Sequence, residues 1–312
     1  MLTSDNRKRT YTDPSSAQNY NANNALQVNS VTQFLSTHIN SAQKNSNIFD
    51  IGSGDGKVTL QVAEFFNSRF TTGIDISRDR VRFARKHYHS RSWFFSRDAA
   101  KLNKTAACET YDIVTSFNSL HHLPEADHPK IFQQMETILK PNGQVFLLVA
   151  SRSPELHDAL DETANSKKWK AHFNGFINPR VYRNEKYYSA LATQAGFSVS
   201  SEINKPTLHT FANRKAIEDF IHGWSPHVGF LKLNSLDALC DQFLKDVSRR
   251  LSEKIGNPDG TLSLPQYNNE LVLRKPGFFA SHSLANRTPT AEEEKLMDSG
   301  APAMNTRKKA KF

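Results

Sequence analysis

A short apolar run that breaks into glycines constrains the fold of this chain more than any other stretch. Residues 47–56 read N-I-F-D-I-G-S-G-D-G, and residues 57–66 then follow an apolar pattern with helical spacing. The apolar residues predict a buried strand, and the glycines allow the backbone to turn sharply beside a ligand. Such a turn places a ligand at the N-terminus of the following helix. The stretch therefore predicts the first strand and the cofactor turn of an α/β domain.

The spacing of this turn disfavours a dinucleotide. The dinucleotide pattern G-x-G-x-x-G needs a third glycine three residues after Gly54, where this chain has Lys57. Asp50 and Asp55 flank the turn, and their carboxylates would repel a pyrophosphate. The same charges favour a ligand that carries an ammonium or sulfonium group.

A second strand narrows the ligand further. Residues 70–75 read F-T-T-G-I-D and end in Asp75, about 20 residues after the turn. An acid at that place suits the two hydroxyls of a ribose. A positively charged ligand with one nucleoside and no diphosphate corresponds to S-adenosylmethionine.

Residues 50–56 resemble the first motif of the class I S-adenosylmethionine-dependent methyltransferases, which is an acid, a hydrophobic residue and G-x-G-x-G. The resemblance implies S-adenosylmethionine as cofactor, S-adenosylhomocysteine as its product, and no metal. It also implies that Asp98, at the end of the third strand, accepts from the adenine amino group. The cofactor-binding residues that it implies are Asp50, Gly52, Ser53, Gly54, Gly56, Asp75, Ile76, Asp98, Ala99, Asn118 and His121.

Alternating strand and helix patterns predict a Rossmann-like, doubly wound α/β sheet. Five parallel strand–helix units are expected, followed by an antiparallel pair that completes the seven-stranded sheet of the resembled family. A helical cap is expected between the last two strands, because too many residues separate them for a hairpin loop. The expected strands are 48–51, 70–75, 93–95, 111–117, 144–150, 197–203 and 271–273, with a turn at 140–143 and cap helices at 213–223 and 235–255.

The expected domain limits follow from the same patterns. Residues 1–22 are polar and predict a flexible arm, whereas residues 23–275 form the methyltransferase domain. The cap insertion spans about 205–266 within it. Residues 280–312 are polar and partly basic, which predicts disorder.

Three stretches outside the core resemble the juvenile hormone acid and trans-aconitate carboxyl methyltransferases. They are residues 20–27, residues 147–179 with the Lys168-Trp169 pair, and residues 188–220. The resemblance implies a small-molecule acceptor, most simply an organic acid, and places Gln27 and His122 in the active site. His122 stands where both enzymes carry tryptophan, so an amine or hydroxyl acceptor stays open.

A carboxylate has a pKa near 4 and is an anion at neutral pH, so it needs no general base to accept a methyl group. Catalysis then depends mainly on orientation and on the exclusion of water. The candidate orienting groups are Gln27, His122 and His209, with Arg152, Arg180, Arg183 and Arg214 as cationic partners.

Composition leaves two other classes open. The chain has 40 Lys and Arg against 31 Asp and Glu, a net charge of +9, so RNA or protein is an alternative acceptor. Residues 118–125, at the end of the fourth strand, contain no Lys or Arg, which disfavours nucleic acid. The acidic run and the basic C-terminus also resemble the tails of secreted bacterial effectors, so an effector that binds S-adenosylmethionine and acts through interaction is a further alternative. The two cysteines and the lack of a long apolar run predict a soluble cytoplasmic protein without a membrane span.

Overall fold

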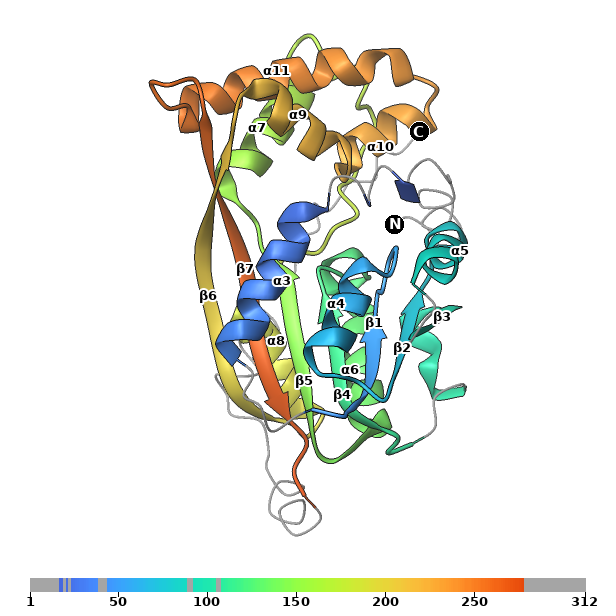
Figure 1. The fold of residues 1–312 in the computed structure, drawn as a ribbon. Helices are drawn as coiled ribbons and strands as arrows, with labels where there is room; N and C mark the ends of the chain where they lie inside the picture. The colour runs from blue at the N-terminus through green and yellow to red at the C-terminus, as the bar shows by residue number, and fades with distance from the viewer. Residues whose placement is uncertain are drawn as a thin grey trace, which may run out of the picture.

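Parallel strands form most of a single seven-stranded sheet. The computed structural model describes residues 17–18, 21, 24–38, 44–88, 92–104 and 108–277. The strand order is β3-β2-β1-β4-β5-β7-β6, and the first five strands pair in parallel. Their arrows point the same way in Figure 1, toward the helices drawn at the top. These strands are β1 (Asn47–Ile51), β2 (Phe70–Asp75), β3 (Ser92–Ser96), β4 (Tyr111–Phe117) and β5 (Leu139–Ala150).

The last two strands complete the sheet as predicted. Strand β7 (Leu262–Arg274) runs antiparallel to both β5 and β6 (Ser198–Phe211). Both strands are much longer than the predicted 197–203 and 271–273, because they continue as a two-stranded ribbon beyond the sheet, with His209 opposite Leu264. The Rossmann-like fold with an antiparallel C-terminal pair is therefore confirmed.

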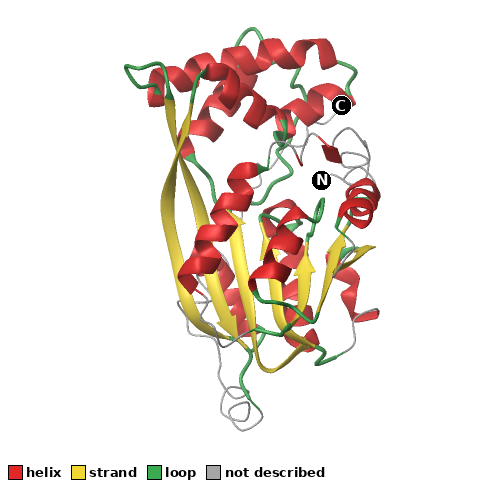
Figure 2. Ribbon diagram, viewed as in Figure 1, coloured by secondary structure: helices red, strands yellow, loops and turns green. Residues whose placement is uncertain are grey.

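Helices cover both faces of the sheet (Figure 2). Residues Ile48, Ile113 and Phe146 pack with α3 and α4, whereas their neighbours along the same strands pack with α6 and α8. This alternation follows from the two-residue period of a strand. The helices are α3 (Ala25–His38), α4 (Lys57–Phe65), α5 (Arg78–His87), α6 (His128–Ile138) and α8 (Glu185–Gln194).

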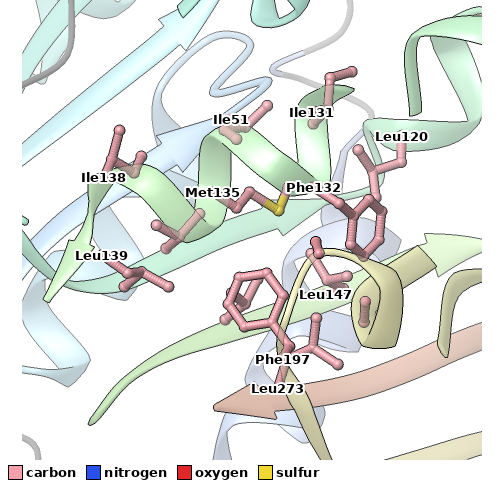
Figure 3. Packing of buried hydrophobic residues seen from close by; sticks show 14 of the residues in the cluster. Ile51, Leu120, Ile131, Phe132, Met135, Ile138, Leu139, Leu147, Phe197 and Leu273 are labelled. Carbon is pink, nitrogen blue, oxygen red and sulfur yellow. The ribbon is translucent and has the colours of Figure 1, made fainter. Parts of the chain in front are cut away.

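The largest buried cluster lies under α6. Its side chains Phe132 and Met135 are completely buried and contact strand residues such as Ile51 and Leu147 (Figure 3). The buried residues of α6 recur three and four positions apart, which aims them at the sheet. Each such side chain contributes about 1.5–3 kcal/mol of transfer free energy on burial. This packing positions the carboxyl end of β4 and the segment 118–123 that follows it.

A second cluster forms a helical cap beyond the carboxyl ends of the strands (Figure 1). The cap helices are α7 (Pro154–Asn165), α9 (Arg214–His222), α10 (Pro226–Leu233), η5 (Asp237–Leu239) and α11 (Cys240–Ile255). The residues between the paired parts of β6 and β7 are 212–261, compared with the predicted 205–266. Helix α7 and Trp169, which precede β6 in the chain, pack into the same cluster.

Two local predictions were wrong, and one helix was not predicted. Helix α10 was not predicted, because its eight residues make only about two turns, too few to show a helical period. The helix predicted at 235–255 begins at Cys240, after the separate turn η5. The turn predicted at 140–143 is an irregularity inside β5, where the pairing with β4 shifts between Tyr111 and Ile113.

Several predictions concern residues that lie outside the part of the chain that the structure describes. Most of the predicted arm at 1–22 and all of the predicted tail at 280–312 lie there. No helix among the described residues has the length and apolar character needed to cross a membrane. In the same described part of the chain, His, Cys, Asp and Glu side chains do not gather into a group that could hold a metal ion.

Candidate active site

The glycine turn after β1 is fastened to the neighbouring strand. The backbone N–H groups of Gly52 and Ser53 donate to the carbonyl of Ile74, at 2.8 and 2.9 Å. Gly52 has φ +80°, and a Cβ there would lie 1.9 Å from Oγ of Ser119. Glycine therefore allows the turn to approach the segment after β4 closely.

Asp75 holds the opposite side of this turn. Its carboxylate accepts hydrogen bonds from the N–H of Gly54 at 3.0 Å and from the N–H of Ser77 at 2.8 Å. These bonds orient the carboxylate at the carboxyl end of β2. Each oxygen has a further lone pair that can accept from a ligand hydroxyl.

Asp50 is buried at the base of the turn. The hydroxyls of Thr59 and Thr115 donate to its two oxygens, at 2.5 and 2.7 Å. Burial raises the pKa of Asp50 to about 6, although the two hydroxyls oppose that shift. Asp50 thus places negative charge beneath the turn near neutral pH.

Asp55 connects the turn to the N-terminal segment. The side-chain amides of Asn21 and Asn24 donate to Oδ2 of Asp55, at 2.9 and 3.0 Å. The N–H of Lys57 donates to Oδ1. Burial raises the pKa of Asp55 above its usual range. The segment that carries Gln27 is therefore positioned by the cofactor turn itself.

A cavity of about 100 Å³, here called the turn cavity, lies against these groups. Its lining contains four carboxylates against two arginines, Arg80 and Arg97. Gly56 is not part of the lining and instead packs against α5, where a Cβ would lie 2.8 Å from Ala84. The residues predicted as functional that line the turn cavity are Gln27, Asp50, Gly52, Ser53, Gly54, Asp75, Ile76, Asp98, Ala99, Asn118 and His122.

The turn cavity fits a cationic adenosyl ligand. The acidic lining attracts positive charge, and Asp75 and Asp98 lie at the ends of adjacent strands. Oγ of Ser53 and Oε1 of Gln27 are buried without a hydrogen-bond partner in the structure, so a polar ligand could satisfy both.

A larger cavity of about 350 Å³, here called the cap cavity, lies between the sheet and the cap. It shares Gln27, Arg80, Asn118 and His122 with the turn cavity, so the two cavities meet at these side chains. Its charged lining consists of Arg80, Arg180 and Lys232, and no carboxylate of the described chain takes part. The two adjoining cavities therefore carry opposite charge.

Three histidines of the cap cavity are held neutral. Burial, assisted by the charge of nearby groups including Arg180, lowers the pKa of His121 and His122 well below the usual range. Burial lowers the pKa of His157 to about 4, and its Nε2 lies 2.8 Å from the Tyr182 hydroxyl. Neutral imidazoles here can orient a polar group through hydrogen bonds without adding charge.

Only some of the residues predicted to bind the acceptor line the cap cavity. Arg180 lines the cap cavity, whereas Arg183 pairs with Glu125, and His209 lines neither cavity. Arg152 forms an ion pair with Asp158, and Arg214 bonds to Ser248. His121, predicted as a cofactor ligand, lines the cap cavity but not the turn cavity.

Sequence reasoning missed several residues that line the cap cavity. They are Arg80, His157, Tyr182, Ser225, Lys232 and Gln266. Their positions in the chain follow no shared spacing, so no pattern in the sequence could have identified them together.

A family model described as a methyltransferase domain matches residues 20–202, more than half of the chain. The juvenile hormone acid O-methyltransferase of Bombyx mori is 28% identical over 269 residues, which cover 81% of this chain and 94% of that enzyme. A ubiquinone biosynthesis O-methyltransferase of Stutzerimonas stutzeri is 29% identical over 136 residues, or 43% of this chain and 54% of that protein.

Solved structures share the fold. Phosphoethanolamine N-methyltransferase 2 of Haemonchus contortus, in complex with phosphomonomethylethanolamine and S-adenosylhomocysteine, matches with a TM-score of 0.55. The match covers 88% of this chain and 61% of that chain at 15% identity. Such a distant likeness supports the arrangement of strands and helices and no finer statement.

Proposed function

Because this chain belongs to the methyltransferase domain family and is therefore an S-adenosylmethionine-dependent enzyme, we propose that it methylates a carboxylate oxygen of a small organic acid. The single observation that carries this proposal is the opposite charge of the two adjoining cavities. The turn cavity is lined by four carboxylates against two arginines. The cap cavity is lined by three cationic side chains, of which Arg80 is shared, and by no carboxylate of the described chain. A positive methyl donor and a negative acceptor match this arrangement.

The positive charge of the cap cavity is large enough to favour an anionic acceptor over a cationic one. Two opposite unit charges 4 Å apart attract by about 4 kcal/mol at an effective dielectric constant of 20. An amine in its ammonium form would instead be repelled by Arg180 and Lys232, without a carboxylate of the described lining to compensate. The cations of the cap cavity therefore attract an anionic acceptor and repel a cationic one.

For the cofactor, the groups around the turn cavity divide into three roles. Asp75 accepts from the ribose hydroxyls, and Asp98 with Ala99 contacts the adenine. Asp50 and the turn from Gly52 to Asp55 hold the end that carries positive charge. The burial of Asp50 and the paired state of Asp75 support these roles, because both carboxylates are already oriented by the protein.

In the reaction, S-adenosylmethionine supplies an electrophilic methyl group on a sulfonium sulfur and leaves as S-adenosylhomocysteine, while the acceptor becomes its methyl ester. The acceptor carboxylate is already ionised, so no residue has to remove a proton. Gln27, Asn118 and His122 orient the carboxylate where the two cavities meet. A neutral His122 can donate a hydrogen bond to one oxygen and leave the other to react.

The cap excludes water from this junction. We infer that residues 23–275 form the methyltransferase domain and that the helices between β6 and β7 close it. The cap cluster around Phe243 and Leu251 is fully buried, which supports a rigid cover over a small acceptor. The juvenile hormone acid enzyme is named for an acid, whereas other relatives act on different acceptors, so this likeness supports the acid only weakly.

A transfer assay with a tritium-labelled methyl donor tests the proposal. Organic acids should be compared with primary amides and amines of the same carbon skeleton. A methyl ester releases volatile tritiated methanol in alkali, whereas methyl amines and aryl methyl ethers do not. We expect base-labile label with acids alone. Base-stable label, with the acids inert, would refute carboxyl methylation and favour an amine acceptor.

A further inference from the structure

The N-terminus of α10 opens onto the cap cavity. Ser225 precedes this helix and Pro226 begins it, and both line the cavity together with Val228. The side chain of Ser225 makes no hydrogen bond to the first turn. Backbone N–H groups at an uncapped helix start carry partial positive charge and can bind an anion.

Two side chains at the same place are buried without partners. Ser225 is 5% exposed, and its Oγ has no hydrogen-bond partner in the structure. Nε1 of Trp224 is also buried and unpartnered, and Trp224 lines the cavity as well. Buried donors of this kind are normally satisfied, so their state points to a ligand with acceptor oxygens.

Arg180 adds a fixed positive charge. Its Nη2 donates to the carbonyl of Trp224 at 2.6 Å, and its guanidinium carbon lies 4.8 Å from the centre of the indole ring. These contacts engage only part of the guanidinium, which has five N–H donors. Arg180 is thus held beside Trp224 and Ser225 with donors left for an anion.

We propose that Arg180, Trp224, Ser225 and the first turn of α10, here called the cap clamp, bind a second anionic group of the acceptor. The inference rests on the proposed carboxyl methylation. One carboxylate of the acceptor reacts where the two cavities meet, and a second carboxylate or a phosphate is held by the cap clamp. The preferred acceptor is therefore an acid with an anion at each end.

The lining of the cap cavity suits an acceptor whose two anionic groups are joined by an apolar segment. Leu156, Phe220 and Leu264 contribute to its lining together with the polar groups. A short hydrocarbon between two anions would contact these side chains, whereas a compact polar acid would leave them exposed to water. The cap clamp would then select both the charge and the length of the acceptor.

Calorimetric binding to the full chain saturated with S-adenosylhomocysteine tests the cap clamp. The probes are α,ω-dicarboxylates from succinate to suberate, monocarboxylates of the same carbon number, and ω-phosphonocarboxylates of matching length. At one preferred length we expect a doubly anionic acid to bind at least about 10-fold tighter than its monocarboxylate. The two dianion series distinguish a clamp for carboxylate from one for phosphate.

Two variants and a control identify the residues responsible. Arg180→Met should lower dianion affinity by about 10-fold or more while leaving the affinities for monocarboxylate and S-adenosylhomocysteine unchanged. Ser225→Ala should give a smaller loss of the same kind and is the milder test should Arg180→Met unfold the cap. Arg152→Met is the matched control, because Arg152 pairs with Asp158 outside the cap cavity.

The outcomes separate the clamp from the proposed function. Equal binding of dianions and monocarboxylates at every length would overturn the clamp, as would an equal loss of both in Arg180→Met. Either result leaves carboxyl methylation intact, because the base-labile product is measured separately. Failure of that product in the transfer assay would instead remove the proposed function on which the clamp rests.

Discussion

The side-chain amide of Asn24 donates a hydrogen bond of 3.0 Å to the carboxylate of Asp55. This bond joins the segment before α3 to the glycine turn after β1. Gln27, one turn further along α3, then lies where the turn cavity meets the cap cavity. The cofactor turn and the acceptor side are thus connected through two polar side chains.

Asn24→Ala should loosen that connection. Asp55 would keep fewer donors while it stays buried, and an under-satisfied buried acceptor costs about 1–3 kcal/mol. We expect a lower melting temperature and about 10-fold weaker binding of S-adenosylmethionine by calorimetry. Ser36→Ala, on the exposed part of α3, is the control. Unchanged binding in Asn24→Ala would show that the contact has no part in forming the cofactor site.

Asp75→Ala should abolish binding of S-adenosylmethionine. The change removes the acceptor for the N–H groups of Gly54 and Ser77 and the proposed partner of the ribose. We expect a loss of about 100-fold or more in affinity, measured by calorimetry. Asp79→Ala, on α5 outside the lining, serves as control. An Asp75 variant with normal affinity would contradict the cofactor assignment.

His122→Ala should separate turnover from cofactor binding. His122 lines both cavities, and its imidazole is proposed to orient the acceptor. We expect kcat/KM to fall by about 10-fold or more while affinity for S-adenosylhomocysteine changes less than about 2-fold. A large loss of cofactor affinity would instead assign His122 to the cofactor.

Gly52→Ala should destabilise the protein. The new Cβ would overlap Oγ of Ser119 at 1.9 Å, and φ of +80° is strained for a residue with a side chain. We expect a loss of at least about 3 kcal/mol in the free energy of unfolding, measured with denaturant. Adding Ser119→Gly should recover the part due to overlap and leave about 1–2 kcal/mol from the strained φ. No recovery in the double variant would contradict this explanation.

The buried His157 predicts a pH dependence of stability. Its folded pKa is about 4, below the usual value of 6.5, so the unfolded chain binds the proton more readily. The contribution of His157 to the free energy of unfolding is fully present above pH 6.5. It falls by about 3 kcal/mol in total as the pH decreases to 4. The stability difference between the wild type and His157→Gln should therefore shrink over this interval. A constant difference would show that His157 does not titrate on unfolding.

Predictions from the sequence were most successful where one short stretch contains the whole feature. A strand, a glycine turn and a helix follow one another in residues 47–66, and the backbone needs of such a turn restrict its residue types directly. Asp75 was predicted from an acid at the end of a second apolar run, about 20 residues after the turn. The structure places it at the carboxyl end of β2, which pairs in parallel with β1.

The acceptor side was harder to predict because it is assembled from distant parts of the chain. The sequence did not distinguish among the four arginines predicted as cationic partners of the acceptor. In the structure, Arg183 forms an ion pair with Glu125, and Arg180 alone of the four lines the cap cavity. Arg152 pairs with Asp158 of α7 and Arg214 bonds to Ser248 of α11, so the partners of these two arginines depend on where the cap helices pack.

The sequence by itself therefore determined the sheet, the cofactor turn and the cofactor class, since local backbone geometry and strand order are encoded in neighbouring residues. Only the tertiary structure decided that Arg180 and Ser225 line the same cavity and that the carboxylates lie in the turn cavity, whereas the cap cavity has cationic groups and no carboxylate of the described chain. Burial in the folded cap also decides the charge state of His157, because a low pKa requires the surroundings that packing creates.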